Sequence, residues 1–548
     1  MVNLGRSWAC RTCKQRRIKC DETEPACNRC KKSGLTCPGY HSEKPLKIRF
    51  KDETKAVTYR ARELDRGRQF PPKIAMHDDS ETLGFNFFIQ NWVRSGRRPN
   101  ASRGLFEHIL PILTVASPSS PAIAAATSVG VFMLAIWQHE YSGHGRGICM
   151  RTTSNALKNL RSGLQGCSAD TVTQQQGLES LLAILLLQWQ ENIAAVYDFR
   201  TASGIHYHGA LALIRQLSAS GFPTPAQGML LGILNTEVAL AIRKGQPVDP
   251  TLIPWFMSLP KSRPLNPANT LNLIGIQVAN IQHRFNNLSL EHAHCASASC
   301  PHTTAITSLH NEILSFETAC AAWHKALPQH WQPHPWRPSA QHPNLHIPMY
   351  NNTCTVFHSV QIASTYNTYL GYRLHISRFL SIMHSHAWLL HTPSQPILSH
   401  IHESIQSLVD ALCAAIPFFL GTYTAMLSLH DLTLPPSSEH SFPSFSNMRD
   451  PPPTPPPDGF QLSEEEHTRH VTAQGAWHAM VALTQVVSVL RRHGEGCGCL
   501  EGVLREGQGE WVRGQLFRAM GVVGVERGEG EGEEEAVREA VGLRASLR

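Results

Sequence analysis

From residue 80 onward, apolar residues recur at intervals of about 3.6 positions, which is the period of an amphipathic helix. Glycine and proline separate the periodic segments, as at Gly221-Phe222-Pro223. Alternation of apolar and polar residues, the sign of a half-buried strand, is rare. The sequence therefore predicts a mostly α protein with a large all-α domain over 80–525. The predicted helical segments are 83–93, 104–115, 121–141, 148–164, 173–197, 203–220, 226–244, 271–288, 303–326, 354–390, 399–427, 467–492 and 511–523.

Two stretches within these segments are almost entirely apolar, "AIAAATSVGVFMLAIW" (122–137) and "LLAILLLQW" (181–189). Both are shorter than the roughly 20 residues that a helix needs to cross a bilayer. The opening residues, "MVNLGRSWAC", lack the apolar region of a secretory signal. We therefore expect buried helices, no membrane partner, and an intracellular protein whose thiols stay reduced.

Positive charge is concentrated at the N-terminal end. Residues 1–75 contain 19 Lys and Arg against 8 Asp and Glu, a net charge of +11, whereas the whole chain carries +7. The rest of the chain is therefore mildly acidic. A basic segment ahead of an acidic body predicts a polyanionic partner for the basic segment. The chain is 42% hydrophobic and only 17% charged, so it has enough apolar residues for a large core.

Six cysteines lie in the first forty residues, and their spacing is a repeat. The pattern C-x2-C-x6-C occurs over 10–20 and again over 27–37. A disulfide framework is unfavourable in a reducing compartment. A thioredoxin-like redox pair would need neither the repeat nor the basic residues between the cysteines. A structural zinc site needs four ligands, so three thiolates in each half suffice only if the halves share ligands.

Sharing one cysteine from each half would give each of two zinc ions four thiolates. The symmetry of the repeat makes the first cysteines of the two halves, Cys10 and Cys27, the expected bridges. A segment of fewer than about 40 residues cannot build an adequate core, so bound metal must supply most of its folding free energy. The expected ligand sets are Cys10, Cys13, Cys20 and Cys27 for one zinc ion, and Cys27, Cys30, Cys37 and Cys10 for the other.

The segment "ACRTCKQRRIKCDETEPACNRCKKSGLTCPGY" (9–40) resembles the fungal Zn2Cys6 binuclear-cluster DNA-binding domain of transcription factors. The similarity comprises all six cysteines, the basic stretch between the second and third, and Pro25 in the connecting loop. The resemblance implies a nuclear, sequence-specific regulator of RNA polymerase II transcription that binds two zinc ions per chain. It also implies double-stranded DNA and coregulators or transcription machinery as partners, and control of a metabolic or secondary-metabolite gene cluster.

In this family, basic residues three and four positions after the second cysteine lie at the base-reading point, and here these are Arg16 and Arg17. The resemblance therefore predicts base contacts from Arg17 first and Arg16 second, to a CGG-type triplet. We expect one helix to run from Arg11 to Cys20. Its other basic residues should contact phosphates, which fixes the register without reading the sequence. These residues are Arg11, Lys14 and Lys19.

The predicted organisation is a zinc domain over 1–40, a basic linker over 41–79, the helical domain over 80–525, and an acidic Gly/Glu-rich tail over 526–548. The linker holds no apolar heptad pattern, so it does not predict a coiled coil. A single half-site, or a homodimer formed through the helical domain, is as compatible with the sequence as a zipper. The linker, the tail and a Pro-rich insert at about 432–460 are predicted to be disordered.

A second resemblance lies in "LLAILLLQWQENIAAVYDFRTASGIHYHGALALIRQLSASG" (181–221), which is similar to the fungal-specific transcription factor domain. The arrangement of the chain is similar to that of acriflavine sensitivity control type regulators, which implies a regulatory helical domain. His206 and His208 in this segment are two positions apart and do not share a helix face, so packing and capping are expected of them rather than metal binding. The matching residues are His206 or His208 with Gly209, Ala210, Leu213 and Ile214.

Catalysis is not expected from this sequence. A catalytic zinc keeps an open position for water, whereas six thiolates close both sites. The body contains no G-x-S-x-G, P-loop, H-E-x-x-H or dinucleotide motif. "EHAHCASASCPH" (291–302) has zinc-binding residue types, but its Ala/Ser-rich composition favours an exposed loop. The alternative function is a zinc-stabilised nuclear scaffold or corepressor without strong sequence specificity. The sequence identifies no small-molecule effector.

Overall fold

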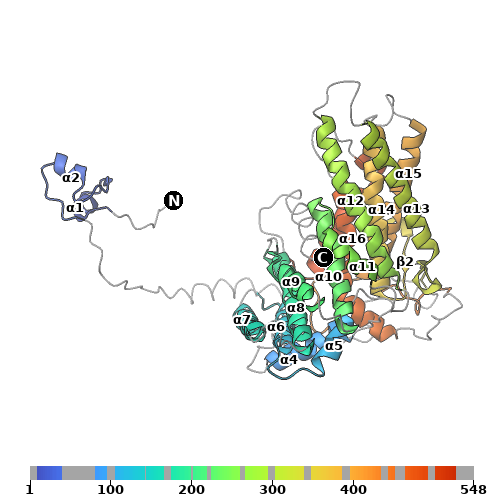
Figure 1. Ribbon diagram of the computed structural model, residues 1–548, viewed down its shortest axis with the longest axis horizontal. Helices are drawn as coiled ribbons and strands as arrows, with labels where there is room; N and C mark the ends of the chain where they lie inside the picture. The colour runs from blue at the N-terminus through green and yellow to red at the C-terminus, as the bar shows by residue number, and fades with distance from the viewer. Residues whose placement is uncertain are drawn as a thin grey trace. The chain divides into compact units, whose positions relative to one another are not determined.

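Figure 1 shows the computed structural model of the chain, which divides into two compact units, Met1–Lys73 and Ile74–Arg548. The residues that the structure describes are 9–39, 80–94, 105–141, 144–165, 174–198, 202–218, 224–258, 266–293, 303–338, 347–385, 395–432, 442–450, 463–490 and 500–525. The predicted linker (41–79) and tail (526–548) both lie outside this set.

Over its described residues, 9–39, the first unit contains two short helices, α1 (Arg11–Gln15) and α2 (Asn28–Lys32). Each begins directly after the first cysteine of one half of the repeat. The third cysteine of each half returns the chain to the centre of the unit, where Cys10, Cys20 and Cys27 are buried. The sequence repeat is therefore also a structural repeat.

The second unit is built of helices, which confirms the predicted mostly α class. Its α-helices in chain order are α4 (Ser80–Phe88), α5 (Phe106–Leu113), α6 (Pro121–Trp137), α7 (His144–Gln165), α8 (Gln174–Tyr197), α9 (Ile205–Ser218), α10 (Thr224–Lys244), α11 (Ile253–Ser258), α12 (Pro267–Ala293), α13 (Thr303–Lys325), α14 (Val360–Ser385), α15 (Gln395–Leu420), α16 (Glu464–Leu490) and α17 (Gln508–Val522). Short 3-10 turns are η2 (Pro250–Leu252), η4 (Gln329–Trp331), η5 (Tyr350–Asn352) and η6 (Leu500–Val503).

The helices of the second unit form two groups that share one hydrophobic core. In the first group, α6 lies centrally and packs against α4, α7 and α8. In the second, the long helices α12, α13, α14 and α15 run side by side, and α16 packs against α14 and α15 (Figure 1). Helix α10 joins the groups, because it contacts α5, α8 and α9 on one side and α12 on the other.

Most predicted helical segments coincide with helices, and the differences have local causes. The segment predicted over 354–390 becomes helical only at Val360. Before it, β2 (Thr355–Val356) pairs antiparallel with β1 (His334–Pro335), which holds that stretch extended. The end of the first predicted segment, η1 (Ile89–Val93), winds as a π-helix rather than an α-helix.

Helix α15 is long and apolar enough to cross a membrane by length and composition. In this structure, 67% of its most apolar window is buried inside the protein. Buried residues such as Leu412, Ile416 and Phe419 belong to the shared core, and α14 and α16 pack against the helix. A central core helix of a helical domain has the same length and composition.

Part of the predicted Pro-rich insert is ordered, so the prediction of disorder is wrong for residues 442–450. Phe442 and Met448 are buried in the core. The side-chain oxygen of Asn447 accepts hydrogen bonds from Trp336 Nε1 and from the backbone N–H of Ser444, each at 2.9 Å. The aromatic residues and methionine of "SFPSFSNM" supply apolar surface to bury, which the neighbouring proline run lacks. The rest of the insert lies outside the described residues.

Helices α4 and α6 approach so closely that their backbones touch at Gly84 and Gly130. A Cβ atom built on Gly130 would lie 2.2 Å from the carbonyl oxygen of Gly84, and one built on Gly84 would lie 2.6 Å from the backbone nitrogen of Val131. Both obstacles are backbone atoms, which cannot move aside as a side chain can. The two glycines therefore set the distance between the helices.

Gly130→Ala should destabilise the helical unit by about 2–3 kcal/mol, because the added methyl group forces α4 away from α6. Denaturant unfolding of the full chain, followed by circular dichroism, measures the change. Gly514→Ala in α17 is the matched control, because nothing lies within 4 Å of a Cβ at that position. The control should gain up to about 1 kcal/mol from helix propensity. Equal stability changes in the two variants would contradict the prediction.

Candidate zinc centre and DNA-contacting surface

The first cysteine of each repeat caps the helix that follows it. Cys10 Sγ accepts a hydrogen bond from the backbone N–H of Cys13 at 3.4 Å, and Cys27 Sγ accepts one from Cys30 at 3.3 Å. A helix N-terminus favours negative charge because its backbone N–H groups point outward with their partial positive charges. The thiolates that start α1 and α2 therefore stabilise the helices that carry the second cysteines.

The six cysteine sulfurs form two groups of four that share Cys10 and Cys27. One group is completed by Cys13 and Cys20 and the other by Cys30 and Cys37, and within each group all sulfurs lie within 4.8 Å of one another. These are the two sets derived from the repeat. All six are buried except Cys37, which is half-buried.

The distances between the sulfurs fit tetrahedral zinc. A zinc–sulfur bond of about 2.3 Å places two sulfurs of one tetrahedral site about 3.8 Å apart. Cys10 Sγ lies 3.7 Å from both Cys27 Sγ and Cys30 Sγ, and Cys13 Sγ lies 3.7 Å from Cys27 Sγ. The first unit thus offers two four-sulfur sites of the size that zinc requires.

Burial and hydrogen bonding act in opposite directions on the thiols. Burial raises the pKa of Cys13 to about 12. Backbone N–H groups of Cys27 and Gly39 lower the pKa of the Cys37 thiol, since they donate hydrogen bonds to its sulfur. Only the thiolate is a zinc ligand, so zinc has to displace the protons of the buried thiols when it binds.

Polar contacts outside the cysteines also join the two halves, and the sequence analysis missed them. Thr12 Oγ1 donates to the carbonyl oxygen of Thr36 at 3.2 Å. The carboxylate of Asp21 accepts from the backbone N–H of Asn28 at 3.1 Å, at the start of α2. These residues lie beside cysteines in the sequence, but no spacing rule assigns their partners.

The helix that carries the basic residues is shorter than predicted. Helix α1 ends at Gln15, and Arg16 is its C-cap. Arg17 has a φ of +53°. Its N–H donates to Lys14 O, and the N–H of Ile18 donates to Cys13 O, both at 3.2 Å. These two bonds are those of a Schellman motif, which ends a helix with a left-handed residue. The prediction of a continuous helix from Arg11 to Cys20 is therefore wrong.

The same motif ends α2, with a glycine in the left-handed position. Gly34 has a φ of +65°, its N–H donates to Lys31 O at 3.2 Å, and the N–H of Leu35 donates to Cys30 O at 3.0 Å. Arg17 and Gly34 are equivalent in the repeat. A side chain in this conformation costs roughly 1–2 kcal/mol. Arg17 thus occupies a position where folding alone favours glycine.

The side chains predicted to contact DNA come from α1 and from the residues just after it. All five are exposed, and none forms a salt bridge with a carboxylate among the described residues. Arg11 and Lys14 belong to α1, and Arg16, Arg17 and Lys19 lie between its end and the buried Cys20. The five are Arg11, Lys14, Arg16, Arg17 and Lys19.

The other candidate metal ligands are not brought together. His206 and His208 lie in α9, and within the described part of the chain only the two cysteine groups place three or more ligand atoms close enough for a metal ion. Residues 294–302 of the His- and Cys-containing segment lie outside that part, so the expectation of an exposed loop there stays a prediction.

Comparison with known families identifies the kind of domain that the first unit contains. Residues 8–47 match the family described as "Fungal Zn(2)-Cys(6) binuclear cluster domain". No curated protein and no solved structure shows a significant match to the chain. The N-terminal segment is therefore a fungal Zn2Cys6 binuclear cluster domain, which binds two zinc ions.

This family is a DNA-binding domain of transcription factors and not an enzyme family. The chain is accordingly a fungal zinc-cluster DNA-binding transcription factor. A nuclear location is typical of proteins that carry this domain. The similarity of the whole chain to acriflavine sensitivity control type regulators is not supported by these comparisons.

Proposed function

We propose that the protein regulates RNA polymerase II transcription in the nucleus by binding CGG-type sites in double-stranded DNA. The observation that carries the proposal is the pair of four-sulfur groups, whose cysteines flank α1 and the residues after it, with their five exposed cations. A short helix held in this way fits its end into the major groove, where guanine presents O6 and N7 to basic side chains.

The five cations divide into two roles in this proposal. Arg17 and Arg16 follow the last residue of α1, so they lie at the end of the helix that would enter the groove. An arginine forms a bidentate pair with guanine. Arg11, Lys14 and Lys19 contact phosphates and supply the salt-dependent, sequence-independent part of the affinity.

The remaining domains support this activity in the same proposal. Residues 1–40 bind DNA, 41–79 link the domains, 80–525 regulate the protein and take part in assembly, including a homodimer, and 526–548 form an acidic tail. Coregulators or the transcription machinery are the further partners. The regulated genes form a metabolic or secondary-metabolite cluster.

Fluorescence anisotropy of the zinc-loaded full chain on a CGG-bearing duplex and on a scrambled duplex of equal composition tests the proposal. We expect tighter binding to the CGG duplex at every salt concentration, because base contacts add to the phosphate contacts that both duplexes share. Affinity for both should fall as salt rises. Equal affinity for the two duplexes would instead favour the alternative, a zinc-stabilised scaffold or corepressor without strong sequence specificity.

A further inference from the structure

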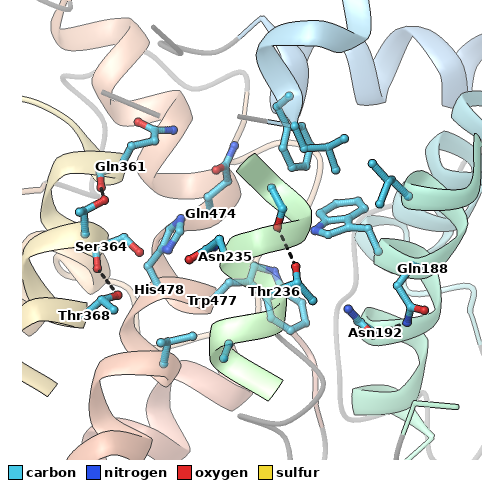
Figure 2. A pocket seen from close by; sticks show the side chains of 18 of the residues that line it. Gln188, Asn192, Asn235, Thr236, Gln361, Ser364, Thr368, Gln474, Trp477 and His478 are labelled. Atoms are coloured by element: carbon cyan, nitrogen blue, oxygen red, sulfur yellow. Dashed lines mark hydrogen bonds between the residues drawn. The ribbon is translucent and has the colours of Figure 1, made fainter. Parts of the chain in front are cut away.

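A cavity of about 300 Å³ lies inside the helical unit, where its two helix groups meet. Figure 2 shows α14 with Ser364 on one side and α8 with Asn192 on the other, with Asn235 and Trp477 between them. Trp92 and Phe106, from η1 and α5, complete the wall. A volume of this size is at the lower end of the range for small-molecule sites, about 300–1,000 Å³.

One part of the cavity wall is aromatic. Trp92, Phe106, Trp189 and Trp477 all line it. Phe106 and Trp189 meet edge to face, with ring centroids 5.4 Å apart, so they hold each other in place. Such a wall suits a flat ring, because aromatic groups pack with one another through offset faces or edges.

The rest of the wall offers uncharged hydrogen-bonding groups. Thr236 Oγ1 donates its proton to the carbonyl oxygen of Gly232 at 3.0 Å, which leaves its oxygen lone pairs as acceptors. Asn192 Oδ1 accepts from Gln188 Nε2 at 2.8 Å, so the amide is oriented with its own NH2 group left as a donor. Within the described part of the chain, no bond is formed by the Asn192 NH2 group, the Ser364 hydroxyl or the Trp477 indole N–H.

Among the described residues that line the cavity there is no Lys, Arg, Asp or Glu side chain, and His478 is the one side chain there that protonation would make a cation. The carboxylate of Glu237 comes near, but it accepts a hydrogen bond from the hydroxyl of Tyr207, which stands in the wall. A cationic ligand would therefore lose part of its hydration without gaining a counter-ion, and an anionic ligand would gain one only if His478 took up a proton. The wall selects against ions and for neutral molecules.

Packing alone does not require these residue types. Helix α8 is entirely apolar over 181–187, where Leu185 already reaches the cavity, and then adds Gln188, Trp189 and Asn192 to the cavity wall. Well-packed cores leave few voids larger than a water molecule. A partly open cavity of this size with oriented donors, acceptors and aromatic rings has the composition of a binding site.

We propose that the helical unit binds an uncharged, ring-containing small molecule with carboxamide- or hydroxyl-type polar groups in this cavity. The ring packs against Trp189 and Trp477, and the polar groups bond with Asn192, Ser364 and Thr236. Because η1, α5 and α8 belong to one helix group and α14 and α16 to the other, the bound molecule contacts both groups at once. This inference does not depend on which DNA sequence the zinc domain recognises.

A panel of matched aromatic probes tests the neutral-ligand requirement. The carboxamide, the carboxylate and the aminomethyl form of benzene, naphthalene and indole are each added to the zinc-loaded full chain. Binding is measured by the shift in melting temperature and by saturable quenching of tryptophan fluorescence. We expect the bicyclic carboxamides to bind and to raise the melting temperature, and both charged forms to bind about tenfold more weakly or worse, because the wall offers them no counter-ion.

Ser364→Phe places a ring in the cavity and should abolish carboxamide binding, whereas the matched Ser385→Phe at the exposed end of α14 should leave it unchanged. Asn192→Asp keeps the shape of the side chain and adds a negative charge, so it should reverse the preference toward the aminomethyl probes. Circular dichroism establishes that each variant is folded. The proposal is overturned if no carboxamide binds, if charged and neutral forms bind equally, or if folded Ser364→Phe and Asn192→Asp both bind as the wild type does.

Discussion

Replacing Cys27 with alanine should remove both zinc ions, whereas replacing Cys37 should remove mainly one. Cys27 belongs to both four-sulfur groups, so its loss leaves three sulfurs at each site. Cys37 belongs to one group only, and the site built from Cys10, Cys13, Cys20 and Cys27 keeps all four of its sulfurs without it.

The expected effect on folding is large, because the described part of the first unit buries few other apolar side chains. Its buried apolar cluster consists of the cysteines themselves, with Ala9 and the half-buried Cys37 packed against them. Structural zinc contributes about 10–16 kcal/mol to the folding of comparable small domains. Cys27→Ala should therefore unfold the zinc domain and abolish DNA binding, while the separate helical unit stays folded.

Zinc counting on the purified full-length variants measures the outcome, with circular dichroism for the helical unit and anisotropy for DNA binding. Cys149→Ala is the matched control, because Cys149 is a buried thiol in α7 of the helical unit. That variant should keep two zinc ions. If Cys27→Ala retained one ion, or if Cys37→Ala lost both, the assignment of Cys27 as a bridge would be wrong.

The helices of this protein were largely predictable, because burial on one side of a helix imposes a period that the sequence displays. The period over 173–197 gave α8 to within a residue or two. Composition gave a wrong prediction where apolar residues lie close to prolines. Residues 442–450 were predicted to belong to a disordered insert, yet Phe442 and Met448 are buried. The contact of Gly84 with Gly130 joins two helices and has no local sequence pattern.

The zinc ligands were predictable for a different reason, since the repeat and the coordination number of zinc together define both four-sulfur sets. The position at which α1 ends could not be predicted in this way. The returning Cys20 suggested a helix through the whole segment, but the chain must leave the helix to bring Cys20 to the zinc site. The cavity could not be predicted either. Its wall is drawn from residues between Trp92 and Val481, and only the packing of several helices brings them together.

Arg17→Gly should lower the affinity for CGG sites and at the same time stabilise the zinc domain. Loss of the arginine removes a bidentate base contact, which costs about 1–3 kcal/mol and relaxes the preference for CGG over a scrambled duplex. Glycine adopts the positive φ of this position without strain, so the free energy of unfolding of the zinc domain should rise by about 1 kcal/mol. The equivalent residue of the second half is already a glycine, Gly34.

Arg17→Ala separates the two effects, because alanine removes the same contact but keeps a Cβ in the left-handed conformation. Both variants should lose sequence preference equally in anisotropy measurements, and only Arg17→Gly should release zinc more slowly to a competing chelator. Lys14→Ala is the control for phosphate contacts: it should weaken binding to both duplexes alike and reduce the salt slope by about one. If Arg17→Ala and Lys14→Ala changed the two duplex affinities in the same way, Arg17 would have no base-reading role. A left-handed arginine would then be a cost to folding without a gain in recognition.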